Sequence, residues 1–281
     1  MIRLCAFSDE YGNKLEEQIE GLKLNNIHLI EIRNVDGKNV LNFTDEEAKY
    51  YYEELAKNDI RVWSIGSPLG KVDIDVDFEE YKNTVLKRLC ELANIFQTSR
   101  IRMFSFFKAY EKKDEVIKKL QEMVNFAKKY NVELYHENEK DIYGAMAPEC
   151  KKLMETFYGD HFKAIFDFAN FVQCGQDTLE AYEMLKSYIA YIHVKDALKS
   201  DQSVVPAGYG DGNVAVILKR LSASGFDGFL SLEPHLFEFE GFHALEKDGR
   251  SIAVKEKKVL SGLETFTIAH DALMELLDNC M

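Results

Sequence analysis

Eight short runs of apolar, β-branched or aromatic residues recur along the chain, and each predicts a buried strand. They span residues 2–7, 27–32, 61–65, 100–106, 132–137, 162–168, 189–194 and 228–233. Longer segments between them, such as 78–96 and 114–130, place apolar residues every three or four positions with charged residues between. That period is typical of a helix that covers a sheet, so the chain alternates strand and helix.

Eight strand–helix units in 281 residues predict an α/β fold, a (β/α)8 TIM barrel, as a single domain spanning residues 1–281. A doubly wound open sheet is the competing architecture. It usually has a glycine-rich turn after the first strand, whereas residues 7–12 read FSDEYG here. Only four prolines occur and no Gly/Ser-rich linker divides the chain, which favours one domain.

Alternation along the strands sorts their side chains into two faces. The apolar stripes, which we expect to face the helices, are Val132 and Leu134; Ala164, Phe166 and Phe168; Ala190, Ile192 and Val194; and Leu230 and Leu232. The opposite phase points four ionisable residues into the barrel at the carboxyl ends of consecutive strands: Glu137, Asp167, His193 and Glu233. Such groups would repel unless a cation compensates them. Taken singly, each is more readily explained as a solvated acid at a strand end or a histidine that is hydrogen-bonded to a neighbour.

Three carboxylates and one imidazole suit one divalent metal ion, with Mn, Mg or Co favoured over Zn. Lys195 shares the inward phase of His193, and Lys199 follows it; either could hold a sugar oxygen or a phosphate, or pair with a carboxylate. Trp63, placed near the end of the third strand, could stack on a sugar or simply pack.

Further polar residues have two interpretations each. The amides of Gly208, Gly210 and Gly212 could cradle a phosphate, or mark a helix start capped by Asp211 or Gly212. For the inward residues of the second strand, Glu31 and Arg33, with Arg102 near them, we expect an ion pair inside the barrel.

Charge and composition limit the classes of partner that the protein can bind. The chain has 35 Lys and Arg against 48 Asp and Glu, a net charge of −13, which disfavours nucleic acid and anionic membrane surfaces. Five scattered cysteines without a CxxC pair predict no disulfide framework, and no apolar run predicts a signal peptide or membrane helix. A cytoplasmic location is the expectation.

The segments LYHENE, FDFANF, YIHVKDA and LSLEPHL, which contain the four ionisable residues, resemble the ligand-bearing strands of the xylose isomerase-like TIM barrels, the sugar phosphate isomerase/epimerase group. The likeness extends to PAGYGDGN at 206–213 and to the tail LSGLETFTIAHDALMELL, which looks like the closing helix of that group. The resemblance implies a (β/α)8 barrel, one divalent metal and chemistry on a ketose, aldose or polyol.

One departure from the family concerns position 170. Many members carry a histidine three residues after the aspartate, but this chain has Asn170, which can hydrogen-bond a substrate hydroxyl and is a poor metal ligand. The three-zinc DNA-repair endonucleases of this fold need that histidine and several more, and this chain has only seven histidines. The departure and the negative charge disfavour that activity.

The function expected is therefore a metal-dependent isomerase or epimerase of a small sugar or sugar derivative, working by enediolate proton transfer. By resemblance, Glu137 and Glu233 approach opposite faces of the reacting carbons as acid and base. A lyase or dehydratase on a polyol or keto-inositol is the runner-up, and a non-catalytic sugar-binding barrel is a third hypothesis. The segment 237–242 is expected to be a lid or a contact between subunits of a homo-oligomer.

Overall fold

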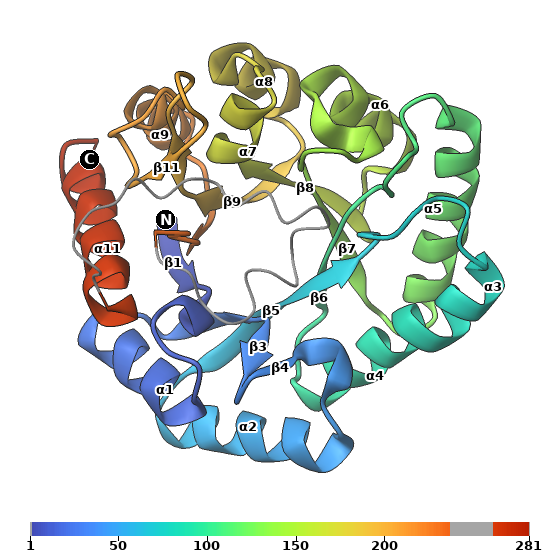
Figure 1. The fold of residues 1–281 in the computed structure, drawn as a ribbon, viewed down its shortest axis with the longest axis horizontal. Coiled ribbons are helices and arrows are strands. Elements are labelled where there is room, and N and C mark those ends of the chain that lie inside the picture. The colour runs from blue at the N-terminus through green and yellow to red at the C-terminus, as the bar shows by residue number, and fades with distance from the viewer. Residues whose placement is uncertain (1, 237–260, 281) are drawn as a thin grey trace.

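The predicted barrel is confirmed by a computed structural model, which describes residues 2–236 and 261–280. Eight parallel strands close into a ring in the order β1-β12-β9-β8-β7-β6-β5-β2, and helices surround it (Figure 1). The segment 237–242, expected to be a lid or contact, lies outside the described residues. The strands are β1 (Ile2–Ala6), β2 (Leu29–Ile32), β5 (Arg61–Leu69), β6 (Arg100–Met103), β7 (Glu133–Glu137), β8 (Phe162–Asp167), β9 (Ile189–Val194) and β12 (Gly228–Leu232).

The outer layer is helical. Its members are α1 (Leu15–Leu24), α2 (Asp45–Lys57), α3 (Phe78–Tyr81), α4 (Lys87–Ile95), α5 (Lys113–Lys128), α6 (Ala147–Phe157), α7 (Phe168–Gln173), α8 (Thr178–Leu185), α9 (Val214–Ala223) and α11 (Gly262–Asp278). The segment 78–96 is helical as predicted, but a π-helical turn, η3 (Lys82–Leu86), joins α3 to α4. The expected closing helix is α11, which begins at a Ser261 capping box and packs beside α9 (Figure 1).

Short elements decorate the connections. Three 3₁₀ turns are η1 (Ser8–Glu10), η2 (Val40–Asn42) and η4 (Tyr143–Ala145), and two small hairpins are β3 (Asn34–Val35) with β4 (Lys38–Asn39) and β10 (Asp196–Ala197) with β11 (Val204–Val205). The hairpins follow β2 and β9, so they extend the carboxyl end of the barrel. None of the helices in the described part of the chain is both long and apolar enough to cross a membrane.

The predicted outward stripes form the main apolar core between sheet and helices. Leu134, Phe166, Ile192 and Leu230 are all fully buried in it. Ala190 is the exception, because the β8–β9 register shifts between Ala164 and Ile165 and Ala190 packs against the inner cluster instead. The expectation for Ala190 is therefore wrong, since a bulge interrupts the alternation.

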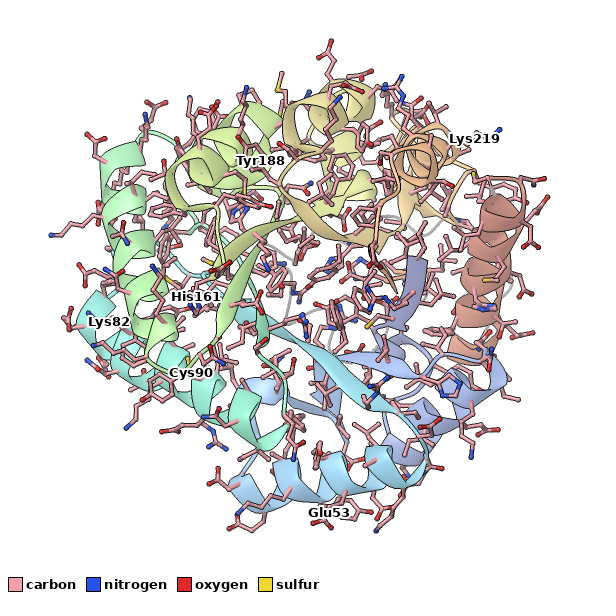
Figure 2. The ribbon with its side chains drawn as sticks, turned by 180° about the vertical axis from the view of Figure 1, so that it is seen from behind. Glu53, Lys82, Cys90, His161, Tyr188 and Lys219 are labelled. Atoms are coloured by element: carbon pink, nitrogen blue, oxygen red, sulfur yellow. The ribbon has the colours of Figure 1, made fainter. Side chains whose placement is uncertain are left out.

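Side chains also fill the interior of the ring, as the view from behind shows (Figure 2). The inner cluster consists of Tyr135, Ile165, Tyr191 and Phe229, with Leu29, Trp63 and Ala190 packed against it. All of these residues lie toward the amino ends of their strands or at mid-strand, which leaves the carboxyl end to polar side chains.

Two strand ends differ from the prediction by three residues or more. β5 continues four residues past Ile65, because Leu69 pairs with Met103 of β6 and the Ser67 hydroxyl donates to the Arg102 carbonyl at 2.6 Å. β6 ends at Met103, three residues before the predicted Phe106.

Candidate active site

Four side chains meet at the carboxyl end of the barrel. Each contributes one ligand atom, and these atoms all lie within 4.8 Å of one another; the residues are Glu137, Asp167, His193 and Glu233. All four are buried, with exposed fractions of 2% or less. The structure thus brings together the set that the strand alternation and the resemblance had indicated.

Strand register explains why they meet. Glu137 ends β7, Asp167 ends β8, and Glu233 directly follows β12. Asp167 pairs with His193 across the β8–β9 ladder, so their side chains leave the sheet at the same height. Because strands in a closed barrel place inward side chains in layers, this height becomes a ring of donors.

The His193 ring lies between carboxylates. Its Nδ1 atom is 2.9 Å from Glu137 Oε1, 3.5 Å from Glu233 Oε2 and 4.0 Å from Asp167 Oδ2. Its Nε2 atom, on the other edge of the ring, is 3.1 Å from Glu31 Oε2. Burial opposes protonation, but Glu137 and Glu31 outweigh it and raise the pKa of His193 to about 10.

Lys195 is the lysine that the structure brings into the cluster. Its Nζ atom lies 2.6 Å from Asp167 Oδ2 and 2.5 Å from Glu233 Oε2, and the side chain is only 3% exposed. Burial alone would lower the pKa of Lys195, but Asp167 and Glu233 raise it well above its usual range. The alternative in which this lysine pairs with a carboxylate is therefore what the structure shows.

Two buried arginines also reach the glutamates. Arg102 Nη1 lies 3.1 Å from Glu137 Oε2 and 3.5 Å from Glu233 Oε1, and Arg33 Nη1 lies 3.0 Å from the same Glu233 oxygen. Burial raises the pKa values of Glu137 and Glu233, but the surrounding cations outweigh that effect and hold both well below the usual range. Burial dominates for Asp167, whose pKa is raised to about 7.

Asparagines fix the backbone beneath the site. Asn138 donates to the Asp167 carbonyl at 3.0 Å and accepts from the Asp167 amide at 2.9 Å, which ties β7 to β8. Asp167 Oδ1 accepts the Asn170 amide at 2.8 Å and caps α7. The Asn170 side chain donates to Glu137 Oε1 at 3.3 Å, so Asn170 stands beside the four donors.

Two sequence candidates do not join the cluster. Trp63 is the third residue of β5, not near its end as expected, and stacks on Phe229 with the Arg100 guanidinium 3.7 Å from its ring. That prediction is wrong because β5 extends to Leu69, which puts Trp63 at the amino end of the barrel. Lys199 is exposed in the connection after β10, where its amide donates to Asp211.

The glycine-rich segment is held by a side chain that the sequence reasoning missed. The buried Asp196 carboxylate accepts the amides of Gly208, Gly210 and Gly212 at 2.8–3.1 Å. A Cβ at Gly210 would lie 2.5 Å from Asp196 Oδ1, so this turn requires glycine. The amides considered for phosphate are therefore bonded within the chain, and α9 begins after Asn213, which differs from the expected caps.

The loop after β1 supplies two more acids that the sequence reasoning missed. Asp9 forms a two-point ion pair with Arg33, at 2.8 and 2.9 Å, and Glu10 Oε1 lies 3.0 Å from Arg33 Nη2. His235 Nε2 lies 3.4 Å from both Glu10 and Glu233. In the sequence, Asp9 and Glu10 lie in a short turn, a position typical of acids that face solvent. Only their position directly after a strand could have indicated that they belong to the site.

The expected ion pair of the second strand is also more complex than predicted. Arg33 contacts Asp9, Glu10 and Glu233, whereas the Glu31 carboxylate accepts hydrogen bonds from Tyr191 and Ser231 besides facing His193. The alternation of the strand predicts that Glu31 and Arg33 lie inside the barrel, but it does not predict which residues they contact.

The donor set fits a divalent ion. Three carboxylate oxygens and one imidazole nitrogen within coordination range are ligands that Mn, Mg, Co and Zn accept. Among the described residues, six buried carboxylates in and around the site face three permanently charged side chains; they are Asp9, Glu10, Glu31, Glu137, Asp167 and Glu233 against Arg33, Arg102 and Lys195. His193, whose pKa is raised to about 10, adds a fourth positive charge, and a metal ion bound at its Nδ1 atom would take the place of one proton.

Comparisons with known proteins agree with this architecture. The model of the family described as xylose isomerase-like TIM barrel matches residues 14–253. No curated protein sequence matches the chain.

Solved structures share the fold across nearly the whole chain. L-ribulose 3-epimerase has a TM-score of 0.75 and 16% identity, covering 100% of this chain and 96% of that one. The IOLI protein, described with a bound zinc atom, has a TM-score of 0.75 and 15% identity, covering 99% of each. The probable 3-DHS dehydratase AsbF of Bacillus anthracis has a TM-score of 0.71 and 18% identity, covering 98% and 99%. Identities this low show a common fold.

Proposed function

Because the chain belongs to the xylose isomerase-like TIM barrel family, we propose that it is a divalent-metal-dependent isomerase or epimerase of a small sugar or sugar derivative. The observation that carries the proposal is the convergence of Glu137, Asp167, His193 and Glu233 within 4.8 Å at the carboxyl end of the barrel. That end holds the active site in TIM-barrel enzymes.

The four residues would hold one divalent ion. When bound, the ion supplies a Lewis acid that polarises a carbonyl and orients the adjacent hydroxyl. The oxygen-rich donor set favours Mn, Mg or Co, although a zinc atom is described in one of the similar structures.

The proton transfers are assigned to two glutamates. Glu137 and Glu233 come from β7 and β12, which are not neighbours in the barrel, so they can approach a ligand from different sides. The low pKa values of both keep them ionised at neutral pH, as a base that removes a proton next to a carbonyl must be. Transfer between two faces inverts a carbon, and return on one face moves the carbonyl.

Two further side chains are proposed to contact the substrate. Asn170 and Lys195 lie beside Glu137 and Glu233, where an amide and an ammonium group can bind sugar oxygens. Trp63 and Lys199 have no such role in the proposal, because the structure places them away from the donors. The ligand is a small sugar or polyol rather than a nucleic acid, given the net charge of −13.

A lyase or dehydratase acting on a polyol or keto-inositol is the second candidate. The likeness to the probable dehydratase AsbF favours it, and the same proton abstraction can expel a neighbouring hydroxyl as water. The two reactions differ in their products, since elimination yields a deoxy or unsaturated carbonyl compound.

The decisive test is solvent exchange. Protein stripped with a chelator and protein reloaded with Mn²⁺, Mg²⁺, Co²⁺ or Zn²⁺ is incubated in D₂O with a panel of ketoses and keto-polyols. Deuterium uptake and product mass are then followed by mass spectrometry. We expect metal-dependent deuterium incorporation with at least one panel member. The proposal is contradicted if stripped and reloaded protein incorporate deuterium equally. It is also contradicted if panel compounds bind but none of them exchanges a proton for deuterium.

A further inference from the structure

Glu31 is a buried acid that touches the candidate metal centre without belonging to its donor set. It lies on β2 with an exposed fraction of 1%, and its Oε2 atom faces His193 Nε2 at 3.1 Å. We propose that Glu31 is a positioning residue, which fixes the His193 ring so that Nδ1 presents its lone pair to a divalent ion. The inference rests on the metal site of the proposed function.

Hydrogen-bond chemistry supports this role. A carboxylate that faces a ring nitrogen accepts its proton, so when a metal ion replaces the proton on Nδ1, the Nε2 atom that faces Glu31 keeps the remaining one. The other ring nitrogen, Nδ1, is the one near Glu137, Glu233 and Asp167. In neutral His193 this contact therefore selects the tautomer whose free lone pair points at the donor ring, an arrangement that metal-binding histidines use widely.

Glu31 is itself held in place from two other strands. The Tyr191 hydroxyl of β9 donates to Oε1 at 2.9 Å, and the Ser231 hydroxyl of β12 donates to Oε2 at 2.8 Å. Ser231 pairs with His193 in the β9–β12 ladder, so the network spans β2, β12 and β9. The carboxylate can therefore hold the ring without moving itself.

Apolar contacts restrict the ring further. The Phe7 ring packs edge-on against His193 with centroids 5.2 Å apart, and the Tyr191 ring does so at 5.4 Å. Packing limits the tilt of the imidazole, but it cannot distinguish the two nitrogens. That distinction falls to Glu31.

The test is a Zn²⁺ titration of Glu31→Gln. A glutamine at this position has one acceptor oxygen and a donor amide, and cannot accept from Tyr191, Ser231 and His193 together. We expect the Kd for Zn²⁺, measured by calorimetry or chelator competition, to weaken roughly 10- to 100-fold. In ¹⁵N-histidine spectra of the Zn²⁺-loaded protein, we expect the wild type to carry its His193 proton on Nε2 and the variant to lose that single tautomer.

Two variants separate position from charge and from stability. Glu31→Asp keeps the charge but withdraws the carboxylate by one methylene, so a loss of affinity like that of Glu31→Gln supports a role in position. Glu133→Gln makes the same chemical change at the amino end of β7, and we expect its Kd for Zn²⁺ to match the wild type. A purely structural role would lower the melting temperature and leave the Kd and the tautomer unchanged.

A milder variant guards against misfolding. Ser231→Ala removes one of the hydrogen bonds that fix Glu31, and we expect a roughly 2- to 10-fold weaker Kd for Zn²⁺. If the folded Glu31 variants and Ser231→Ala all bind Zn²⁺ with a Kd within twofold of the wild type, this inference is overturned and the proposed function is not affected. If the wild-type protein binds no divalent ion, the proposed function fails with it.

Discussion

The two ends of the barrel interior are built on the same strands and differ sharply in chemistry. At the amino end, Trp63 and Phe229 stack on each other, and the guanidinium groups of Arg100 and Arg3 lie 3.7 and 3.9 Å from their rings. At the carboxyl end, the inward positions are ionisable. On β9 the change takes a single step of the pleat, from Tyr191 to His193.

The contrast shows that the two ends of one strand can serve different purposes, one for stability and the other for chemistry. The stacked pair Trp63 and Phe229, which we call the aromatic plug, removes apolar surface from water and stabilises the fold. The charged ring concentrates carboxylates that repel one another and are held by cations, an arrangement that costs free energy and enables chemistry. Substitutions at the two ends should therefore separate activity from stability, and four predictions test this.

The largest effect concerns the two glutamates of the site, compared with a control glutamate at the amino end of β7. With metal at saturation, we expect Glu137→Gln and Glu233→Gln to lower turnover and deuterium exchange by about 10² to 10⁴-fold, the usual worth of one acid or base group. Glu133→Gln, at the amino end of β7, should keep turnover within about twofold. Steady-state kinetics and exchange in D₂O measure both. If both site variants exchange deuterium as fast as the wild type, Glu137 and Glu233 are not the acid and base of the reaction.

The second prediction concerns the aromatic plug. We expect Phe229→Ala to lower the free energy of unfolding by about 3 kcal/mol, because it opens a cavity beside Trp63 and removes the face on which Arg3 lies. The Kd for a divalent ion should stay within about threefold of the wild type. Urea unfolding and calorimetry give the two numbers. A variant as stable as the wild type but with metal binding lost would reverse the proposed division.

The third prediction compares two buried histidines on opposite faces of the sheet. His193 faces carboxylates, whereas His136 lies on the helix side of β7 beside the Ser105 hydroxyl, and burial lowers the pKa of His136 to about 4. The unfolded chain binds a proton at this residue near pH 6.5, so its contribution to stability is complete above that pH and is lost as the pH falls toward 4. The loss amounts to about 3 kcal/mol.

Urea unfolding between pH 7 and pH 4 measures this linkage. We expect His136→Gln to be less stable than the wild type at pH 7 and to lose less stability on acidification. A wild-type slope equal to that of the variant would show that His136 does not carry the effect.

The smallest effect concerns the rim of the charged end. Lys199 is exposed outside the donor ring, so we expect Lys199→Ala to change kcat/KM by less than about twofold. Lys195→Gln, which removes the ammonium between Asp167 and Glu233, should change it by far more. Equal losses in the two variants would extend the site beyond the ring.

Much of this molecule follows from its hydrophobic pattern. Alternation along four strands was enough to place Glu137, Asp167, His193 and Glu233 on the inner face, because a parallel barrel strand has only two faces and its outer one must be apolar. The eight strands were likewise visible as separate apolar runs, and a parallel barrel of consecutive strand–helix units follows from them.

What the pattern missed depends on contacts between distant residues. Trp63 was assigned to the wrong end because the length of β5 is set by pairing with β6, and Ala190 because a bulge shifts the β8–β9 register. Asp196 holds glycines that lie 12 to 16 residues further on. Such partners are chosen in three dimensions, and local periodicity carries no record of them.

The Asp196 carboxylate has a consequence for ligand choice. Three backbone amides that could have received an anionic headgroup from solution are already engaged by an anion of the protein's own making. These amides are therefore not free to bind a phosphate group, and any phosphate on a ligand would have to be bound by other groups of the protein.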